Sequence, residues 1–140
     1  MVLFITIALI IGVIVPAVTV WDNADKTVVR AELSGDWTWD ERAQSVREAV
    51  DMMRSVSHQV DLIAIHHNNR IPSGAMLQGR RLLNAMPDNW GFMVIVSGGF
   101  IRSMIMLLKQ VSGSQGERIL VAASLEEARI LLTQQRTGHG

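Results

Sequence analysis

Hydrophobic and polar positions divide the 140-residue chain into an apolar N-terminal run and a longer patterned part. No charged residue precedes Asp22, and residues 2–15 are almost wholly aliphatic. A membrane-spanning helix needs about 20 apolar residues. Residues 1–20 reach that length only as one continuous helix, which Pro16 disfavours because proline lacks an amide donor. We expect residues 1–16 to be a separate hydrophobic segment, with three interpretations open: a membrane anchor, a secretory signal or a spurious extension.

Alternating apolar and polar residues from Ala17 onward predict a β-hairpin, with its turn at residues 22–25. An amphipathic helix is predicted over residues 39–55, because its apolar residues recur at spacings of four, three, four and three. Thr38 and Glu41 have the spacing of a capping box at the start of this helix.

Near-continuous apolar runs of strand length follow, which is typical of strands covered on both faces; they lie at residues 60–65, 92–96 and 119–122. Helices are predicted between and after these strands, at residues 74–85, 100–111 and 124–132. Ser73 is expected to cap the first of these helices, and Ser124 with Glu127 the last. Residues 112–117 are predicted to form a polar loop, and residues 134–140 a flexible tail.

The resulting order, β-β-α-β-α-β-α-β-α, predicts a single α/β domain over residues 17–133 with about four helices. Buried strands separated by helices pair in parallel through right-handed crossovers. We therefore expect a mixed, mostly parallel sheet of four to five strands, with the antiparallel pair supplied by the hairpin.

The composition excludes several functional classes. The chain has 13 Lys and Arg against 13 Asp and Glu, so it lacks the positive excess of a nucleic-acid-binding protein. It contains no cysteine, which excludes disulfides, thiolate zinc sites and a cysteine nucleophile.

Candidate chemistry is expected in the loops at the carboxyl ends of the parallel strands, where ligands of open α/β sheets bind. Each of these loops leads into a helix N-terminus, which favours an anion. The candidate regulatory or anion-binding residues in these loops are Ser73, Gly74, Ser97, Gly98, Gly99 and Ser124.

No motif in these loops specifies a catalytic site, a metal site or a cofactor. His66 and His67 are adjacent, so in a strand they point to opposite faces and do not easily share one metal ion; we expect both to be solvated. The sequence around Ser73 is not a nucleophile elbow. We therefore expect a non-enzymatic protein without a cofactor.

The stretch VDLIAIHHNNRIPSGAMLQGRRLL at residues 60–83 resembles the centre of a STAS domain, the fold of bacterial anti-sigma-factor antagonists and of sulfate-transporter tails. In that family a hydrophobic strand leads into a loop that ends Asp-Ser-Ser/Thr-Gly, and Ser73-Gly74 align with the end of this motif. The later stretches NWGFMVIVSGG, RILVAAS and SLEEARILL match the second half of the family in layout.

The resemblance implies a non-enzymatic regulatory module that docks a protein partner and is sometimes controlled by phosphorylation of the motif serine. Here Ile71-Pro72 replaces the family's acidic residue, so we expect Ser73 to act only as a helix cap. The predicted location is cytoplasmic or membrane-associated, the latter through the stretch that begins at Val2 and ends at Val20. The alternative function is a small-ligand carrier that holds an anionic or lipid-like molecule at the loops named above.

Overall fold

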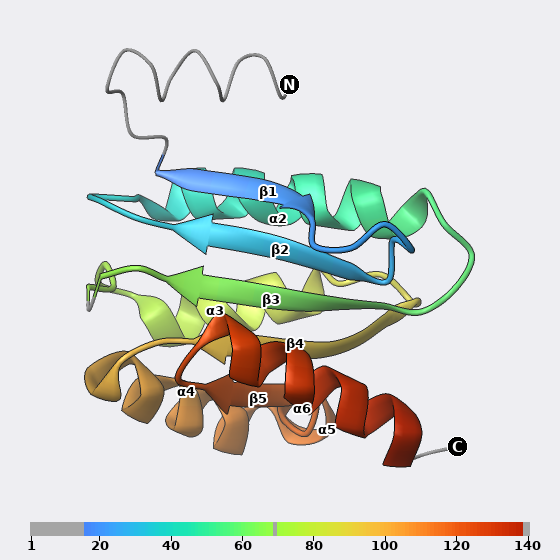
Figure 1. Ribbon diagram of the computed structural model, residues 1–140. Coiled ribbons are helices and arrows are strands. Elements are labelled where there is room, and N and C mark those ends of the chain that lie inside the picture. Colours follow the sequence, from blue (N-terminus) through green and yellow to red (C-terminus); the bar gives the residue numbers. More distant parts are fainter. Residues whose placement is uncertain (1–15, 69, 139–140) are drawn as a thin grey trace.

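The computed structural model describes residues 16–68 and 70–138, which form five strands and five helices (Figure 1). The strands are β1 (Ala17–Trp21), β2 (Val28–Leu33), β3 (Val60–His66), β4 (Trp90–Val96) and β5 (Ile119–Ala122). The helices are α2 (Trp39–Arg54), α3 (Ala75–Asn84), α4 (Gly99–Val111), α5 (Gly113–Gly116) and α6 (Leu125–Gly138). The predicted α/β class and element order are confirmed, and the short α5 is an addition within the predicted polar loop.

The five strands form one mixed sheet in the order β1-β2-β3-β4-β5. β1 and β2 pair antiparallel as the predicted hairpin, and every other neighbouring pair is parallel. The central strand β3 is buried at each residue from Val60 to Ile65, which explains its continuous apolar sequence.

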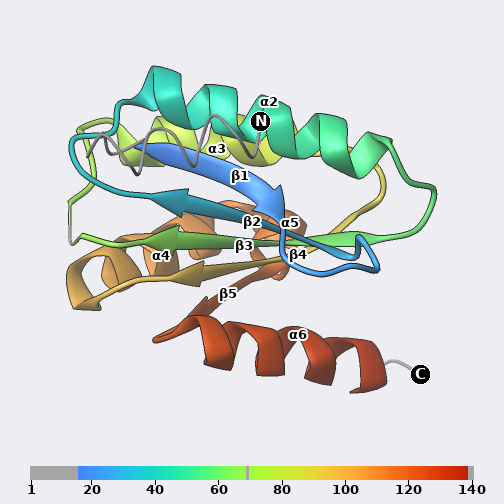
Figure 2. The same ribbon diagram turned by 45° about the horizontal axis from the view of Figure 1, so that its top comes forward.

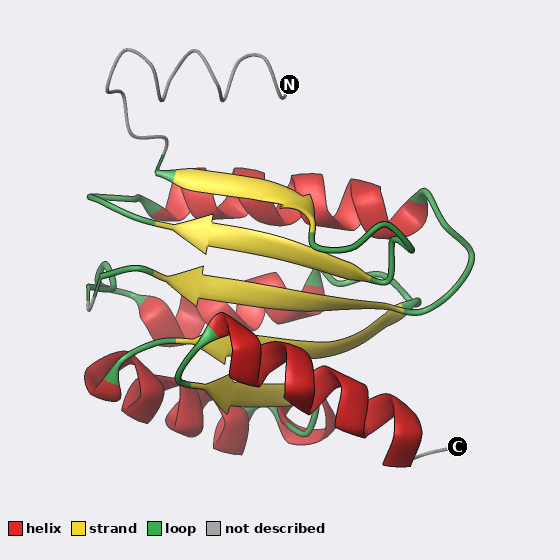
Figure 3. Ribbon diagram, in the orientation of Figure 1, coloured by secondary structure: helices red, strands yellow, loops and turns green. Residues whose placement is uncertain are grey.

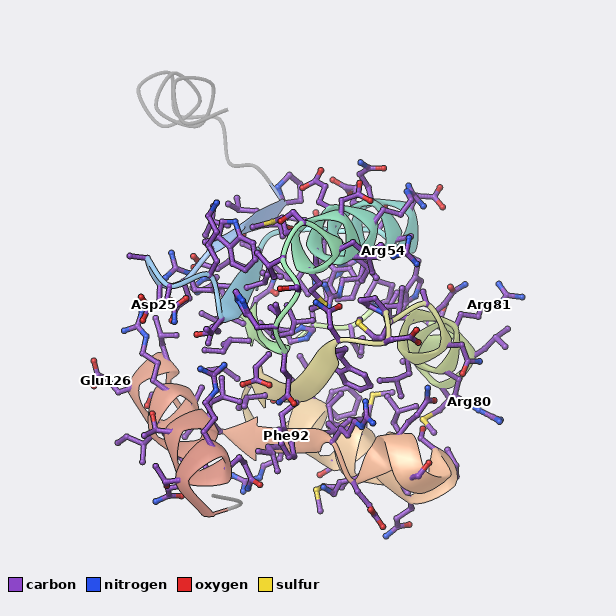
Figure 4. The ribbon with its side chains drawn as sticks, turned by 90° about the vertical axis from the view of Figure 1, so that its right-hand side faces the viewer. Asp25, Arg54, Arg80, Arg81, Phe92 and Glu126 are labelled. Atoms are coloured by element: carbon purple, nitrogen blue, oxygen red, sulfur yellow. The ribbon has the colours of Figure 1, made fainter. Side chains whose placement is uncertain are left out.

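Helices cover both faces of the sheet, with α2, α3 and α4 on one face and α6 on the other (Figures 2 and 4). The first face is the larger core, where Met53 of α2, Leu83 of α3 and Ile105 of α4 pack on the strands. The opposite core is smaller and is closed by Ala128 and Leu132 of α6. The loops that follow β3, β4 and β5 lie at one end of the sheet (Figure 3).

The expectation of a flexible tail at residues 134–140 is wrong for residues 134–138, because α6 continues to Gly138. Arg136 holds this last turn against the sheet. Its Nη2 donates to Asp61 Oδ2 at 2.9 Å and to the Thr27 carbonyl at 2.9 Å. Asp61 lies on β3 and is only 1% exposed. Because it is far from Arg136 in the sequence, the pattern of residues 134–138 alone does not reveal this partner.

A second ionic contact connects α6 to the hairpin. Asp22 Oδ1 accepts from Arg129 Nη2 at 2.8 Å and from Arg30 Nη1 at 2.7 Å. The hydrogen bond and charge of Arg129, assisted by Arg30, hold the pKa of Asp22 below its ordinary value of 3.8.

Apart from Pro16, the hydrophobic segment expected at residues 1–16 lies outside the described residues. Pro16 begins the described part, and its carbonyl accepts from the Ser34 amide at 2.9 Å. Within residues 16–68 and 70–138, none of the helices has the length and apolar character that crossing a membrane requires.

Candidate functional site

The three predicted serines lie after neighbouring parallel strands, but their local roles differ. Ser124 caps α6: its Oγ accepts from the Glu127 amide at 3.1 Å, while Glu127 Oε2 accepts from the Ala123 amide at 2.9 Å. The predicted cap is therefore present, with the glutamate reaching one residue further back than in a standard capping box.

The expectation that Ser73 caps the second helix is wrong. Gly74 occupies the N-cap of α3 with a left-handed φ of 88°, and it makes no side-chain cap hydrogen bond. Since only glycine adopts this backbone conformation without strain, the turn into α3 depends on Gly74. Ser73 contributes its carbonyl instead, which accepts from Trp39 Nε1 at 2.8 Å.

Ser97 and the two glycines form the turn from β4 into α4. Gly98 is the N-cap of α4 and Gly99 its first residue, again without a side-chain cap. The Ser97 Oγ is buried and has no hydrogen-bond partner among the described residues. These positions do not meet Ser73 or Ser124 in a common cavity among those found in the described part of the chain.

A cavity of about 60 Å³ lies elsewhere, between the sheet and the layer made by α2, α3 and α4. We call it the Arg42 cavity, after the basic residue in its wall. Most of the lining is apolar, and half of the lining residues come from α3 and α4, including Met76, Leu82, Leu83, Met104, Ile105 and Leu108. None of the described residues that line it is acidic.

The lining also includes side chains with polar atoms, among them Trp37, Arg42 and His66. Trp37 is fully buried, and its ring lies 5.8 Å from the His66 ring, centroid to centroid. Arg42 is only 5% exposed on α2. Trp37 Nε1, Arg42 Nη1 and His66 Nδ1 are all buried without a hydrogen-bond partner among the described residues.

The surroundings shift the ionisation of both basic groups. Burial lowers the pKa of Arg42 to about 10, well below the ordinary range of arginine, so the guanidinium still carries its charge at neutral pH. Burial, followed by the charges of Arg42 and His67, lowers the pKa of His66 to about 4. His66 is therefore a neutral imidazole at pH 7.

Contacts from the loop after β3 cover this polar wall. Trp39 packs edge-on against Trp37 with centroids 5.0 Å apart, and its Nε1 bonds the Ser73 carbonyl. Arg70 Nη1 donates to the Trp37 carbonyl at 3.1 Å. Ser73 therefore contacts the cavity lining through its backbone carbonyl but does not line the cavity itself.

Sequence reasoning missed this site in two ways. His66 is expected in a solvated loop, but it is the last residue of β3 and is half-buried, whereas His67 is exposed and bonds Glu32 Oε1 at 2.7 Å. The sequence predicts no site role for Arg42. It lies three residues after Trp39 and four before Val46, a spacing that puts it on the buried face. The two histidines do point apart, and no group of three or more metal-ligating side chains occurs among the described residues.

The fold and the cavity together define a class: a mixed α/β domain with a small, mainly apolar cavity and one buried cationic wall. No protein-family model, no curated protein and no solved structure matches this chain. The resemblance to STAS domains therefore remains a prediction from the sequence.

Proposed function

We propose that this protein binds a small anionic ligand in the Arg42 cavity, the second of the two functions predicted from the sequence. The observation that carries the proposal is a guanidinium that is buried and charged, with Nη1 unpaired, in the wall of an apolar cavity. The proposed binding site differs in position from the site predicted from the sequence, because the cavity lies beneath α3 and α4 and not at the helix N-termini.

Burying the guanidinium of Arg42 without a counterion destabilises the folded protein. A buried ion without a counterion costs several kcal/mol even after relaxation, and each buried unpaired donor costs about 1–3 kcal/mol. Such costs persist in native proteins mainly where function requires them. An anion placed against Arg42 supplies the missing charge and the missing acceptors at once.

The other sequence-based prediction, a regulatory module that docks a protein partner, rests on the STAS resemblance alone. We prefer ligand binding because it accounts for the buried polar groups of the described structure. The two functions are compatible, since a bound ligand stabilises the conformation that carries it and can bias a partner's docking.

Thermal unfolding of the full chain with a panel of small organic anions tests the proposal. A ligand at a hundredfold excess over its Kd stabilises a protein by about 2.7 kcal/mol, which corresponds to a Tm increase of several degrees. We expect at least one carboxylate, sulfonate or phosphate monoester to raise the Tm of the wild type.

Two variants of α2 serve as test and control. Arg42→Met removes the buried charge, and we expect it to abolish the anion-dependent Tm increase. Arg47→Met removes an exposed arginine from the same helix and should respond like the wild type. The proposal fails if none of the anions binds, or if Arg42→Met responds as strongly as Arg47→Met.

A further inference from the structure

Exposed apolar side chains concentrate on one outer surface of the protein, made by α3 and α4. Six large hydrophobic residues are exposed among the described residues, and five of them belong to these two helices. With exposed fractions between 46% and 58%, the five are Leu77, Phe100, Met106, Leu107 and Val111. We call the surface that they form the α3–α4 face. A group of exposed apolar residues on neighbouring helices indicates an interaction surface, whereas a single one needs no explanation.

The two helices are direct neighbours, and the core uses only one side of α4. Gly79 of α3 faces Leu108 of α4 so closely that an added Cβ would lie 2.9 Å from Leu108 Cδ2. The residues of α4 that pack in the core recur at spacings of four and three: Ile101, Ile105 and Leu108. A second line of apolar residues recurs at spacings of seven and four on the exposed side: Phe100, Leu107 and Val111. Packing on the sheet therefore does not explain the second line.

The same two helices carry an excess of positive charge. They contain four basic residues, Arg80, Arg81, Arg102 and Lys109, and no acidic residue, although basic and acidic residues are equal in number over the whole chain. Arg80 and Arg81 point outward from α3 (Figure 4), and Arg102 is exposed on α4. Among the described residues, none of these three arginines has an ion pair or a side-chain hydrogen bond. Unpaired positive charge therefore lies beside the exposed apolar side chains.

We infer that the α3–α4 face binds the surface of an anionic lipid membrane. Exposed Phe and Leu next to Arg are typical of helices that lie in the plane of a membrane interface, with the apolar side chains among the headgroups. Anionic headgroups supply the negative charge that α3 and α4 lack. None of the residues that form this face lines the Arg42 cavity, so the inference does not depend on the proposed function.

A second copy of the chain or a protein partner fits this surface less well. Two copies that meet through the same face would bring their arginines together, and like charges across an interface repel. A protein partner usually places anchor side chains in pockets. None of the five exposed hydrophobic residues lines a cavity identified among the described residues. A bilayer needs no such pocket, because lipids rearrange around projecting side chains.

Co-sedimentation of the full chain with lipid vesicles tests the inference. Vesicles of phosphatidylcholine with about 30% phosphatidylserine should bind at least tenfold more tightly than pure phosphatidylcholine vesicles in about 0.1 M salt. The difference should disappear in about 1 M salt, where the Debye length is about 3 Å. Residues 1–15 have no charged side chain, so vesicle binding through them should not depend on lipid charge.

Matched apolar variants locate the contact on α4. The double variant Phe100→Ser and Leu107→Ser should weaken binding to the anionic vesicles at least tenfold. Ile130→Ser changes the exposed hydrophobic residue of α6, on the opposite face of the sheet, and should change binding less than twofold. These side chains are exposed, so the variants should keep the circular dichroism spectrum of the wild type.

Matched charge variants test the electrostatic part. Arg80→Gln with Arg102→Gln should weaken binding to the anionic vesicles at least tenfold. Arg47→Gln with Arg54→Gln removes the same net charge from exposed positions on α2 and should weaken binding less than threefold.

A fluorescent label on α4 gives a readout that binding through residues 1–15 cannot produce. The chain has no cysteine, so Leu107→Cys can be labelled at one position with an environment-sensitive fluorophore. Its emission should rise severalfold on anionic vesicles, and that of labelled Ile130→Cys should stay unchanged. Unchanged emission from position 107, equal binding to neutral and anionic vesicles, or equal losses in test and control variants would overturn the inference. Self-association that Phe100→Ser abolishes, without vesicle binding, would assign the face to a second copy and overturn it as well.

Discussion

Replacing Arg42 by methionine is expected to stabilise the unliganded protein by about 3 kcal/mol at neutral pH. The guanidinium lies in an apolar cavity wall, and burial lowers its pKa to about 10, well below the ordinary range of arginine. At about 1.4 kcal/mol per pKa unit, that difference corresponds to roughly 3 kcal/mol of unfavourable burial. Methionine is flexible and apolar, so it fills similar space without a charge to desolvate.

The sign of this stability change follows from the protonation of Arg42 in the folded and in the unfolded chain. Below pH 10 the arginine is charged in the folded and in the unfolded chain, so the full desolvation cost is present throughout the neutral range. The cost decreases only above about pH 10, where the folded chain loses the proton before the unfolded chain does. Replacements of buried ionic groups by apolar residues have stabilised other proteins by about 1–4 kcal/mol, which agrees with this magnitude.

Urea unfolding at pH 7, monitored by tryptophan fluorescence, measures the effect. Arg47→Met is the matched control, since this arginine is exposed on the same helix and its loss should change the free energy of unfolding by less than about 0.5 kcal/mol. If Arg42→Met is less stable than the wild type by 1 kcal/mol or more, the arginine gains more from its contacts than burial costs it. In that case the charge of Arg42 is compensated in the folded protein and is not an unpaired buried charge.

Asp22→Asn should lower the free energy of unfolding by about 1–3 kcal/mol at pH 7, because the carboxylate accepts from two arginines. Since the pKa of Asp22 in the folded protein is below 3.8, this loss of stability should become smaller as the pH falls below about 4. A loss of stability independent of pH would contradict the ionic assignment. Thr38→Ala should cost about 1 kcal/mol through loss of the capping box, whereas Ser73→Ala should cost less than about 0.5 kcal/mol in urea unfolding. Equal losses for these two variants would show that Ser73 does cap its helix. Gly91→Ala should lower the free energy of unfolding by about 1–3 kcal/mol, because the added Cβ would overlap the carboxylate of Asp61 and the side-chain amide of Gln59. Gly99→Ala is the control: the space around Gly99 is open, so this variant should leave the melting temperature nearly unchanged.

The sheet and most of its helices could be predicted because local signals agree with the tertiary fold. The apolar run at residues 60–65 is a buried central strand, and the Thr38–Glu41 pair caps α2 as its spacing indicates. The start of α3 could not be assigned so simply, because Ser73 and Gly74 are both acceptable caps and the backbone conformation decides between them. The end of α6 depends on an ion pair between residues 75 positions apart in the chain.

The candidate site was less predictable than the fold. The sequence directed attention to loop serines and glycines at helix N-termini, whereas the cavity assembles side chains from α2, β3, α3 and α4. A charged residue inside an amphipathic helix is most often solvated, so Arg42 carried no strong signal on its own. Its burial depends on the tertiary packing of α2, which also brings Trp37, Trp39 and the loop after β3 into contact.

The sequence by itself determined the α/β class, the element order, the hairpin and the absence of cysteine chemistry. These features depend on periodicity, capping and composition, which act over a few neighbouring residues. Tertiary structure alone decided that Trp37, Arg42 and His66 line one largely apolar cavity, that the histidine is neutral, and that Arg42 Nη1 has no partner among the described residues. Burial and ionisation depend on groups brought together from distant parts of the chain, so the chemistry of this site is determined by packing and not by local pattern.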